Sequence, residues 1–499
     1  MSDYDVVVIG AGLGGLSSGA LLASQGRKVL VLEQGERIGG CCSTFERDGY
    51  HFDTGASIVE IIEPMQRAFK MMGTTLEQEV DLINCDPVMT SIFKDGSHVT
   101  YPLSAAKTGE VISSIDADDG RRWKDFVAYM DELLEVTLNT FFSEPVSTMA
   151  DMVNIIRKDP RFVKFLPAFV SSYQDVLQKY FKNETVLKTM GYQSLYLGLP
   201  PALVPGAFAL LVYSEHTGIY YPRGGMIKIP EALQRVGERF GMQVRLKTAV
   251  DKVIMDGRRA RGVVLEDGTQ ITADVVVSNI NARTLYLDMI GEEYLPSLAA
   301  RGIKSYAYSK AVPMIYLGLK GKPQLEGHHS MIAVSPEDIN QYWWNYVDKG
   351  KLLDENVGLI CWPTYSDPSL APKGRHVVNL IPEGFYNLKG TNWVDEKPRF
   401  IERSLEYFSK TAVPGLKDLV EVVDCSTPLD YEQRLRLPEG AIYAFQEDLT
   451  AQAVFRPAAR SRVVDGLYLT GASTHPGGGV PTTIASGIIA ANLINKYEQ

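Results

Sequence analysis

Residues 5–33 read DVVVIGAGLGGLSSGALLASQGRKVLVLE. The first five residues form an apolar run that is typical of a buried parallel strand. A glycine-rich turn follows, then a stretch of small residues that suits a helix packed closely on a sheet. Lys28–Leu32 form a second apolar run, and Glu33 comes directly after it. The pattern predicts strand, turn, helix and parallel strand, the unit that binds dinucleotides in α/β proteins.

The glycine spacing in this unit has a physical meaning at each position. Gly10 permits the tight turn after the strand, Gly12 lets the backbone approach a pyrophosphate, and Gly15 lets helix and strand pack closely. Unpaired N–H groups at the helix N-terminus suit phosphate oxygens. Glu33 can accept hydrogen bonds from ribose hydroxyls, and its charge disfavours the 2′-phosphate of NADP. The GxGxxG pattern is weak alone, but strand, helix and acid around it indicate dinucleotide binding rather than a structural turn.

Two further segments favour FAD over NAD. Arg37-Ile-Gly39-Gly40 follows Glu33, and a long extended cofactor needs such close backbone approach beyond its pyrophosphate. Near the C-terminus, Leu469-Thr-Gly471 precedes a helix predicted to start at Pro481. A helix N-terminus there would stabilise negative charge on a reduced flavin. These segments predict FAD as the cofactor.

The predicted FAD contacts come from all of these segments, from Asp53-Thr-Gly55-Ala56, which follows the double glycine, and from two strands in the middle of the chain. They are Gly10, Ala11, Gly12, Leu13, Gly14, Gly15, Glu33, Gln34, Arg37, Gly39, Gly40, Cys41, Ser43, Gly55, Ala56, Val250, Ser278, Gly471, Ala472, Gly479, Val480 and Pro481. We interpret the adjacent Cys41 and Cys42 as close packing against the cofactor rather than a redox pair, because adjacent cysteines bridge only with strain.

The fold class that we predict is α/β. A Rossmann-like FAD-binding domain, with a central parallel sheet and a β-meander, carries an inserted mixed α+β, largely helical substrate domain. The expected FAD-binding pieces are residues 1–100, 221–300 and 426–499; the substrate domain takes residues 101–220, its helical part, and 301–425. Apolar residues at helical spacing between Trp123 and Leu134 indicate the helical part.

Several longer motifs carry a family resemblance. They are Glu46–Gly55, Tyr220–Met226, Asp367–Gly374, Gln452–Pro457 and Gly471–Pro481. With them the whole chain resembles the phytoene desaturase type of carotenoid desaturase and isomerase, within the amine-oxidase-like flavoproteins. Many relatives carry Arg after the double glycine, where this chain has Cys41 and Cys42.

The resemblance implies C–C bond oxidation in a long isoprenoid such as phytoene. Hydride would leave an allylic carbon for flavin N5, and a proton would leave the neighbouring carbon. An apolar small-molecule substrate needs few polar catalytic residues, and the protein supplies orientation and a dry tunnel. His475 is the candidate catalytic residue, the alternative being a loop histidine that hydrogen-bonds backbone. The electron acceptor stays open among quinone, oxygen and nicotinamide.

Three other functions remain as alternatives at this point. A reduced flavin on the same scaffold could isomerise or saturate a polyene, with dependence on an added reductant. A flavin amine oxidase would release peroxide with polar amines. A non-catalytic, FAD-stabilised isoprenoid carrier would bind lipid without flavin turnover.

The composition limits which partners and which cellular compartment are expected. The net charge is −10, so nucleic acid is not an expected partner. The five cysteines form no CxxC pair and the seven histidines show no ligand spacing, so we expect no metal site and a reducing, cytoplasmic location. Residues 157–213 join a basic, aromatic stretch to an uncharged one. They indicate either peripheral membrane contact or the helical wall of the substrate domain.

Several other positions also have ordinary structural interpretations. Asp53 and Arg223 could touch substrate or hold loops, and Glu60 and Glu63 could face a pocket or solvent. The pair His328-His329 is predicted to form a surface turn.

Overall fold

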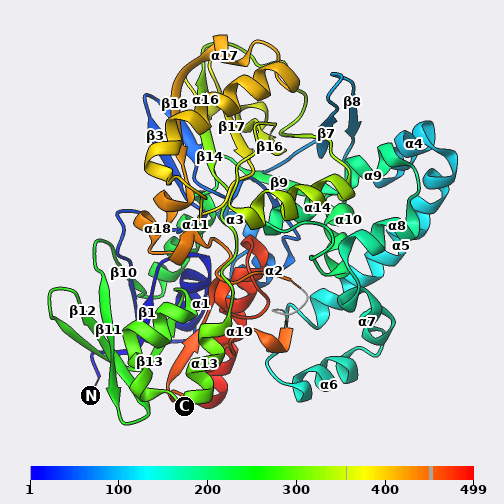
Figure 1. Cartoon of the computed structure of the whole chain (residues 1–499). Helices are drawn as coiled ribbons and strands as arrows, with labels where there is room; N and C mark the ends of the chain where they lie inside the picture. Colours follow the sequence, from blue (N-terminus) through cyan, green and yellow to red (C-terminus); the bar gives the residue numbers. More distant parts are fainter. Residues whose placement is uncertain (1, 356, 449–452, 499) are drawn as a thin grey trace.

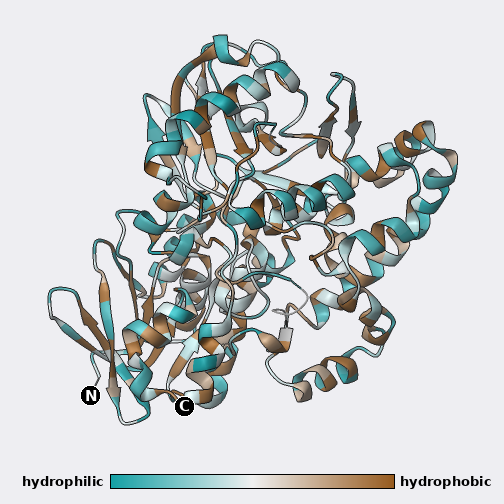
Figure 2. Ribbon diagram, in the orientation of Figure 1, coloured by the Kyte–Doolittle hydropathy of each residue, from teal (hydrophilic) through white to brown (hydrophobic). Residues whose placement is uncertain are grey.

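A computed structural model of the chain describes residues 2–355, 357–448 and 453–498. Two large sheets stand one above the other in Figure 1, and a group of helices flanks them on one side. In Figure 2 the peripheral helices carry both hydrophilic and hydrophobic residues, as expected of helices with one buried face.

The first sheet contains the predicted nucleotide-binding strands. Its order is β10-β2-β1-β13-β12-β11, and β19 pairs with β13. The strands are β1 Tyr4–Ile9, β2 Val29–Leu32, β10 Gln243–Arg245, β11 Val250–Asp256, β12 Arg259–Leu265, β13 Gln270–Ser278 and β19 Leu467–Leu469. β10, β2, β1, β13 and β19 run parallel, whereas β11, β12 and β13 form an antiparallel meander. The predicted Rossmann-like sheet with its meander is therefore confirmed.

Two helices distant in sequence pack side by side on this sheet. They are α1, Leu13–Ser24, and α19, Val480–Tyr497, which lie next to each other in Figure 1 in dark blue and red. A Cβ at Gly487 would approach the Ser17 Oγ to 2.0 Å and the Gly14 carbonyl oxygen to 2.9 Å. Small residues on both helices thus allow the close approach that brings the two ends of the chain to one place. On the same layer α11, Lys228–Arg239, packs against α1.

The second sheet has the order β18-β14-β17-β16-β15-β7-β8. Its strands are β7 Met89–Ile92, β8 His98–Tyr101, β14 Met314–Leu319, β15 His329–Ile332, β16 Gly358–Cys361, β17 His376–Pro382 and β18 Val420–Ser426. One face packs on α16, Trp393–Thr411, through Trp393, Phe400 and Phe408. Because β7 and β8 belong to this sheet, the boundary expected at residue 100 does not follow the strand pairing.

Two small sheets tie the layers together. β3, Thr44–Arg47, pairs with β4, Tyr50–Asp53. β9, Ile219–Pro222, pairs with both β5, Val59–Glu60, and β6, Leu82–Asn84.

The region between residues 101 and 220 is largely helical, as predicted. Its helices are α4 Ala105–Ile115, α5 Ala117–Asn139, α6 Met149–Lys158, α7 Phe162–Val170, α8 Tyr173–Tyr180, α9 Glu184–Met190 and α10 Leu210–Ser214. Trp123, Phe126, Met130 and Leu133 form the buried stripe of α5. The remaining α-helices are α2 Glu63–Met71, α3 Leu76–Glu79, α12 Ala282–Thr284, α13 Ser297–Ser305, α14 Pro336–Asn345, α15 Pro363–Ser366, α17 Leu416–Leu419 and α18 Pro428–Leu435.

Candidate functional site

One long cavity of about 1050 Å³ is lined by segments from the whole chain. One part of its wall comes from the glycine turn after β1, the end of β2 and the start of α19. The other part comes from α5, α6, α7 and α10 and from strands of the second sheet. The cavity therefore joins the nucleotide-binding layer to the substrate domain.

The turn after β1 is shaped by its glycines and by Glu33. Gly10 has a φ of +93°, which favours glycine. A Cβ at Gly15 would lie 2.1 Å from the Gly10 carbonyl oxygen, so only glycine permits this contact between helix and turn. The Glu33 carboxylate accepts hydrogen bonds from the Ala11 N–H at 2.9 Å and from the Gly35 N–H at 2.8 Å. Glu33 thus holds the turn and stands at the cavity wall, where ribose hydroxyls would meet it.

The double glycine lies directly beside this turn. The Gly39 N–H donates to the Ala11 carbonyl at 2.8 Å, and Gly39 and Gly40 have φ values of +97° and +60°. A Cβ at Gly55 would lie 2.6 Å from the Cys41 carbonyl oxygen. The backbone therefore runs along the cavity without side chains in the way.

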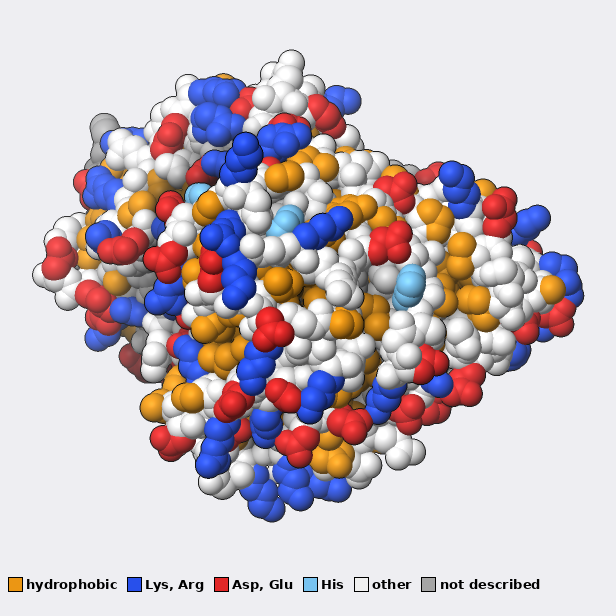
Figure 3. Space-filling view, turned by 90° about the horizontal axis from the view of Figure 1, so that it is seen from above, with side chains coloured by type: hydrophobic (Ala, Val, Ile, Leu, Met, Phe, Trp, Pro, Cys, Tyr) orange, Lys and Arg blue, Asp and Glu red, His pale blue; other side chains and the backbone are white. Residues whose placement is uncertain are grey.

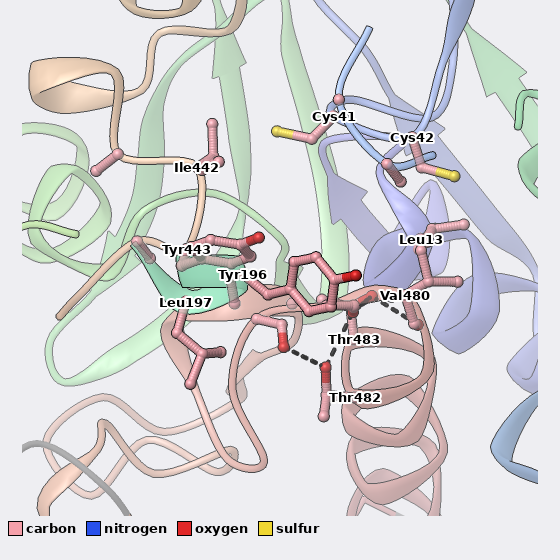
Figure 4. A pocket seen from close by; sticks show the side chains of 18 of the residues that line it. Leu13, Cys41, Cys42, Tyr196, Leu197, Ile442, Tyr443, Val480, Thr482 and Thr483 are labelled. Atoms are coloured by element: carbon pink, nitrogen blue, oxygen red, sulfur yellow. Dashed lines mark hydrogen bonds between the residues drawn. The ribbon is translucent and has the colours of Figure 1, made fainter. Parts of the chain in front are cut away.

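The C-terminal segment closes the same space. A Cβ at Gly14 would lie 2.5 Å from the Gly471 nitrogen, so the loop after β19 touches the start of α1. α19 begins after Gly479 with no side-chain cap, which leaves its first N–H groups for a ligand. Figure 4 shows Leu13, Cys41 and Tyr443 around this space, with Val480 and Thr483 at the start of α19.

A buried ion pair that the sequence did not indicate anchors this loop. Arg456 and Glu447 are both buried, with 3.4 Å between guanidinium and carboxylate. Arg456 also donates to the Ala472 carbonyl at 2.5 Å, and the Gly478 N–H donates to Glu447 at 2.7 Å. The pair fixes both ends of the segment that faces the cavity.

Most of the predicted FAD contacts lie on the cavity wall. They are Gly10, Gly12, Leu13, Gly14, Glu33, Gln34, Gly39, Gly40, Cys41, Gly55, Ala56, Val250, Gly471, Ala472, Gly479, Val480 and Pro481. Five others, Ala11, Gly15, Arg37, Ser43 and Ser278, are not among its lining residues. Gly15 allows α1 to pack against the turn at Gly10, and the Arg37 guanidinium donates to the Thr44 carbonyl at 3.3 Å.

His475 also lies off the cavity wall. Its Nε2 donates to the Phe141 carbonyl at 2.6 Å, and the two rings meet edge-on with 4.3 Å between their centroids. Burial lowers the pKa of His475 to about 3, so the imidazole is neutral at physiological pH. This geometry ties the C-terminal loop to the end of α5, and a catalytic role for His475 stays a prediction.

Asp53 and Arg223 hold loops in this structure. The buried Asp53 carboxyl accepts from the Thr44 hydroxyl at 2.6 Å, the Tyr221 hydroxyl at 2.6 Å and the Met226 N–H at 2.8 Å. Arg223 is exposed and donates to Asp81 at 2.7 Å. The end of β4 is thereby fastened to β9 and to the segment that follows β9.

Glu60 faces the cavity and belongs to a buried polar cluster. Its carboxyl accepts from the Ser214 hydroxyl, next to the buried Glu215. Glu215 accepts from the hydroxyls of Tyr192 at 3.2 Å and Tyr196 at 3.4 Å, and both tyrosines line the cavity. Burial raises the pKa of Glu60 to about 7, and burial together with the Glu60 charge raises the pKa of Glu215. Burial therefore favours the protonated form of each carboxyl, and the charge of Glu60 further disfavours ionisation of Glu215.

The prediction of a surface turn at His328-His329 is wrong. Both histidines are buried, because β15 lies inside the sheet between β16 and β7. His328 Nε2 donates to the Ser57 carbonyl at 3.1 Å and lies 3.3 Å from the Cys361 Sγ, while Nδ1 is 2.8 Å from the Ser366 hydroxyl. Both nitrogens of His328 thus have protein partners.

The residues present fit an extended flavin nucleotide. Backbone lines the cavity where several Cβ atoms would obstruct it, the Glu33 carboxylate lies on the cavity wall, and the start of α19 has no side-chain cap. These features, together with the fold, define an FAD-dependent oxidoreductase.

Comparison with known proteins supports the same class of protein. The chain belongs to the flavin containing amine oxidoreductase family, whose model matches residues 13–495. A phytoene desaturase of Fusarium fujikuroi is 30% identical, with 99% of this chain and 90% of that protein covered. The zeta-carotene-forming phytoene desaturase of Myxococcus xanthus is 28% identical, with 98% and 93% covered.

Solved structures share the fold at low identity. Putrescine oxidase bound to putrescine superposes with a TM-score of 0.65 at 15% identity, covering 99% of each chain. An oxidoreductase from Methanosarcina mazei gives 0.63 at 18% identity, covering 98% of this chain and 99% of that one.

Proposed function

We propose that the protein uses FAD to desaturate C–C bonds of a long apolar isoprenoid, a carotenoid precursor such as phytoene. The observation that carries the proposal is the continuity of the cavity. From the glycine-lined part it extends between apolar side chains of the helical region and the second sheet, among them Leu133, Phe169, Leu211 and Met331. The similarity to phytoene desaturases supports the same substrate class.

Bound FAD would accept the hydride at N5 when a C–H bond is broken. Lining residues of the turn after β1, the double-glycine segment and the start of α19, among them Leu13, Cys41 and Val480, would hold it. The apolar walls would keep the polyene extended and exclude water. The neighbouring carbon must lose a proton for the double bond to form. The Glu60 carboxyl lies on the cavity wall with a pKa of about 7 and is suited to accept that proton.

Anaerobic incubation of the purified holoenzyme with phytoene in liposomes tests this function. Flavin bleaching together with a red-shifted polyene spectrum is expected. Spectral change only after a reductant is added would replace desaturation by saturation or isomerisation. Peroxide release with amines, and no response to phytoene, would instead identify an amine oxidase.

We further propose that the substrate enters from a bilayer at the mouth formed by α6 and α7. Met149, Val170 and Phe455 are exposed yet also line the cavity, with Met149 71% and Val170 77% exposed. Val153 and Val163 on the same helices are exposed as well. Within the described residues, no helix has both the length and the apolar character needed to cross a membrane. Docking would therefore be peripheral and apolar.

The charged residues at this mouth favour an apolar rather than an electrostatic contact. Lys158 pairs with Glu144, Arg161 with Glu135 and Asp159, and Lys164 with Glu132. The uncharged stretch after residue 195 supplies cavity wall through Leu195, Leu197 and Leu210. On the upper face of the molecule, which Figure 3 shows, Lys and Arg side chains are interspersed with Asp and Glu.

Liposome flotation tests the docking surface. Met149→Glu and Val170→Glu together should abolish flotation, since each puts a charge at the apolar mouth. Leu298→Glu is the matched control, because Leu298 is 80% exposed on α13. Equal flotation of the double variant and the control would disprove docking through α6 and α7.

A further inference from the structure

Besides Glu33 and Glu60, the cavity wall carries the carboxyl group of Glu383, which has no partner among the described residues. Glu383 follows β17 directly, lines the cavity and is only 5% exposed. Among residues 2–355, 357–448 and 453–498, none forms a hydrogen bond or ion pair with its carboxyl group. Burial of an unpaired polar group costs stability, so such groups persist mainly where a ligand uses them.

The surroundings of Glu383 are apolar. The cavity-lining residues near it include Met314 in β14, Val357 just before β16, and Ile381 in β17. The Tyr342 hydroxyl on α14 is also buried and has no hydrogen-bond partner among the described residues. Burial raises the pKa of Tyr342, and the charge of an ionised Glu383 would raise it further, so the two groups are within electrostatic reach. Two polar groups without a hydrogen-bond partner among the described residues therefore lie within electrostatic reach of each other, and of the two Glu383 lines the cavity.

Glu383 differs in this respect from Glu60, the other carboxyl discussed above. Glu60 accepts from Ser214 and belongs to a cluster whose members hydrogen-bond one another. Its presence is explained without a ligand, whereas that of Glu383 is not.

The protonation state limits what Glu383 can bind. Burial alone raises the pKa of Glu383 to about 8, so the carboxyl is mostly neutral at pH 7. A neutral carboxyl donates one hydrogen bond and accepts others, which suits an alcohol or a carbonyl. An ammonium ion would require an ionised carboxylate among apolar side chains, which is costly.

We propose that Glu383 binds a hydroxyl or carbonyl oxygen of the isoprenoid, so that the preferred substrate is an oxygenated polyene rather than a pure hydrocarbon. The assignment rests on the proposed function for the isoprenoid class and deepens it. A site that hydrogen-bonds a substrate oxygen discriminates strongly against the analogue that lacks it, because the buried carboxyl is then left unpaired.

Equilibrium binding to the holoenzyme tests the proposal without turnover. The probes are lycopene, lycopene with one terminal hydroxyl group, and octadecylamine, each in detergent micelles and followed by quenching of tryptophan fluorescence. The variants are Glu383→Leu, which removes the polar group, and Glu383→Gln, which keeps a donor and an acceptor. Flavin content and Tm check the fold of each variant.

The wild type should bind the hydroxylated polyene at least about tenfold more tightly than lycopene. Glu383→Leu should reduce that ratio below about twofold and raise Tm, whereas Glu383→Gln should keep the ratio within about threefold of the wild type. A wild type without preference, or an unchanged ratio in Glu383→Leu, overturns the proposal. Tightest binding of octadecylamine, lost in Glu383→Leu, overturns it in favour of a cation site.

The failure of the proposed function would look different. If no polyene bleaches the flavin while the hydroxyl preference depends on Glu383, the desaturase function fails and the binding site stands. If phytoene bleaches the flavin but the protein does not prefer the hydroxylated polyene, the desaturase function stands and the proposed role of Glu383 fails.

Discussion

Replacement of Glu33 by alanine should weaken FAD binding by about 1–3 kcal/mol, or roughly 5- to 150-fold in Kd. The Glu33 carboxylate accepts two backbone hydrogen bonds, from Ala11 at 2.9 Å and from Gly35 at 2.8 Å. It also lines the cavity at the end of β2, where the ribose hydroxyls would meet it. Hydrogen bonds to a charged group contribute about 1.5–3 kcal/mol each, and water in the variant restores part of that loss.

The assay is titration of the apoprotein with FAD, followed by flavin fluorescence. Glu36→Ala is the matched control, because Glu36 lies three residues further on and forms an exposed ion pair with Lys247. The control should change Kd by less than about twofold, since exposed ion pairs contribute little. A Glu33→Ala variant that binds FAD within twofold of the wild type would show that the adenosine is not bound at the end of β2.

Three further predictions concern groups that the fold buries. Arg456→Met should destabilise the protein by about 3–5 kcal/mol in urea unfolding, because it leaves the Glu447 carboxylate buried without its cationic partner. A loss below about 1 kcal/mol would contradict the role of this pair. Gly15→Ala should cost about 1–3 kcal/mol and reduce flavin content, because its Cβ would lie 2.1 Å from a backbone oxygen of Gly10; full flavin loading with an unchanged Tm would refute this. In the folded protein Glu383 keeps its proton up to about pH 8, whereas in the unfolded chain it loses the proton near pH 4.5. The free energy of unfolding of the wild type should therefore fall relative to that of Glu383→Gln as pH rises between these two values. The slope should reach up to about 1.4 kcal/mol per pH unit. Urea unfolding of both proteins at about pH 5 and pH 7.5 measures the difference, and parallel pH profiles would show that Glu383 is not buried as a neutral acid.

The features that could be predicted from the amino-acid sequence are those with a local physical cause. The run from Asp5 to Glu33 specifies strand, turn and helix within one short segment, and β1, α1 and β2 form there. Glycines at Gly12 and Gly39 indicate close backbone approach, and both line the cavity. The helix after Pro481 was likewise readable from its own residues. Turn geometry and hydrophobic period depend on near neighbours, so a single sequence contains them.

The features that could not be predicted depend on partners far away in the chain. His328 is buried because β15 acquires β7 and β16 as neighbours, and its own residues do not indicate which strands those are. Arg456 and Glu447 find each other in a loop that only the packing of α19 against α1 brings to the cavity. Nothing in the sequence around Glu383 distinguishes it from an exposed acid, whereas in the folded protein it is buried at the cavity wall beside the second sheet. Burial and the pKa shifts that follow from it are properties of the assembled fold, because they depend on which distant side chains exclude solvent from each group.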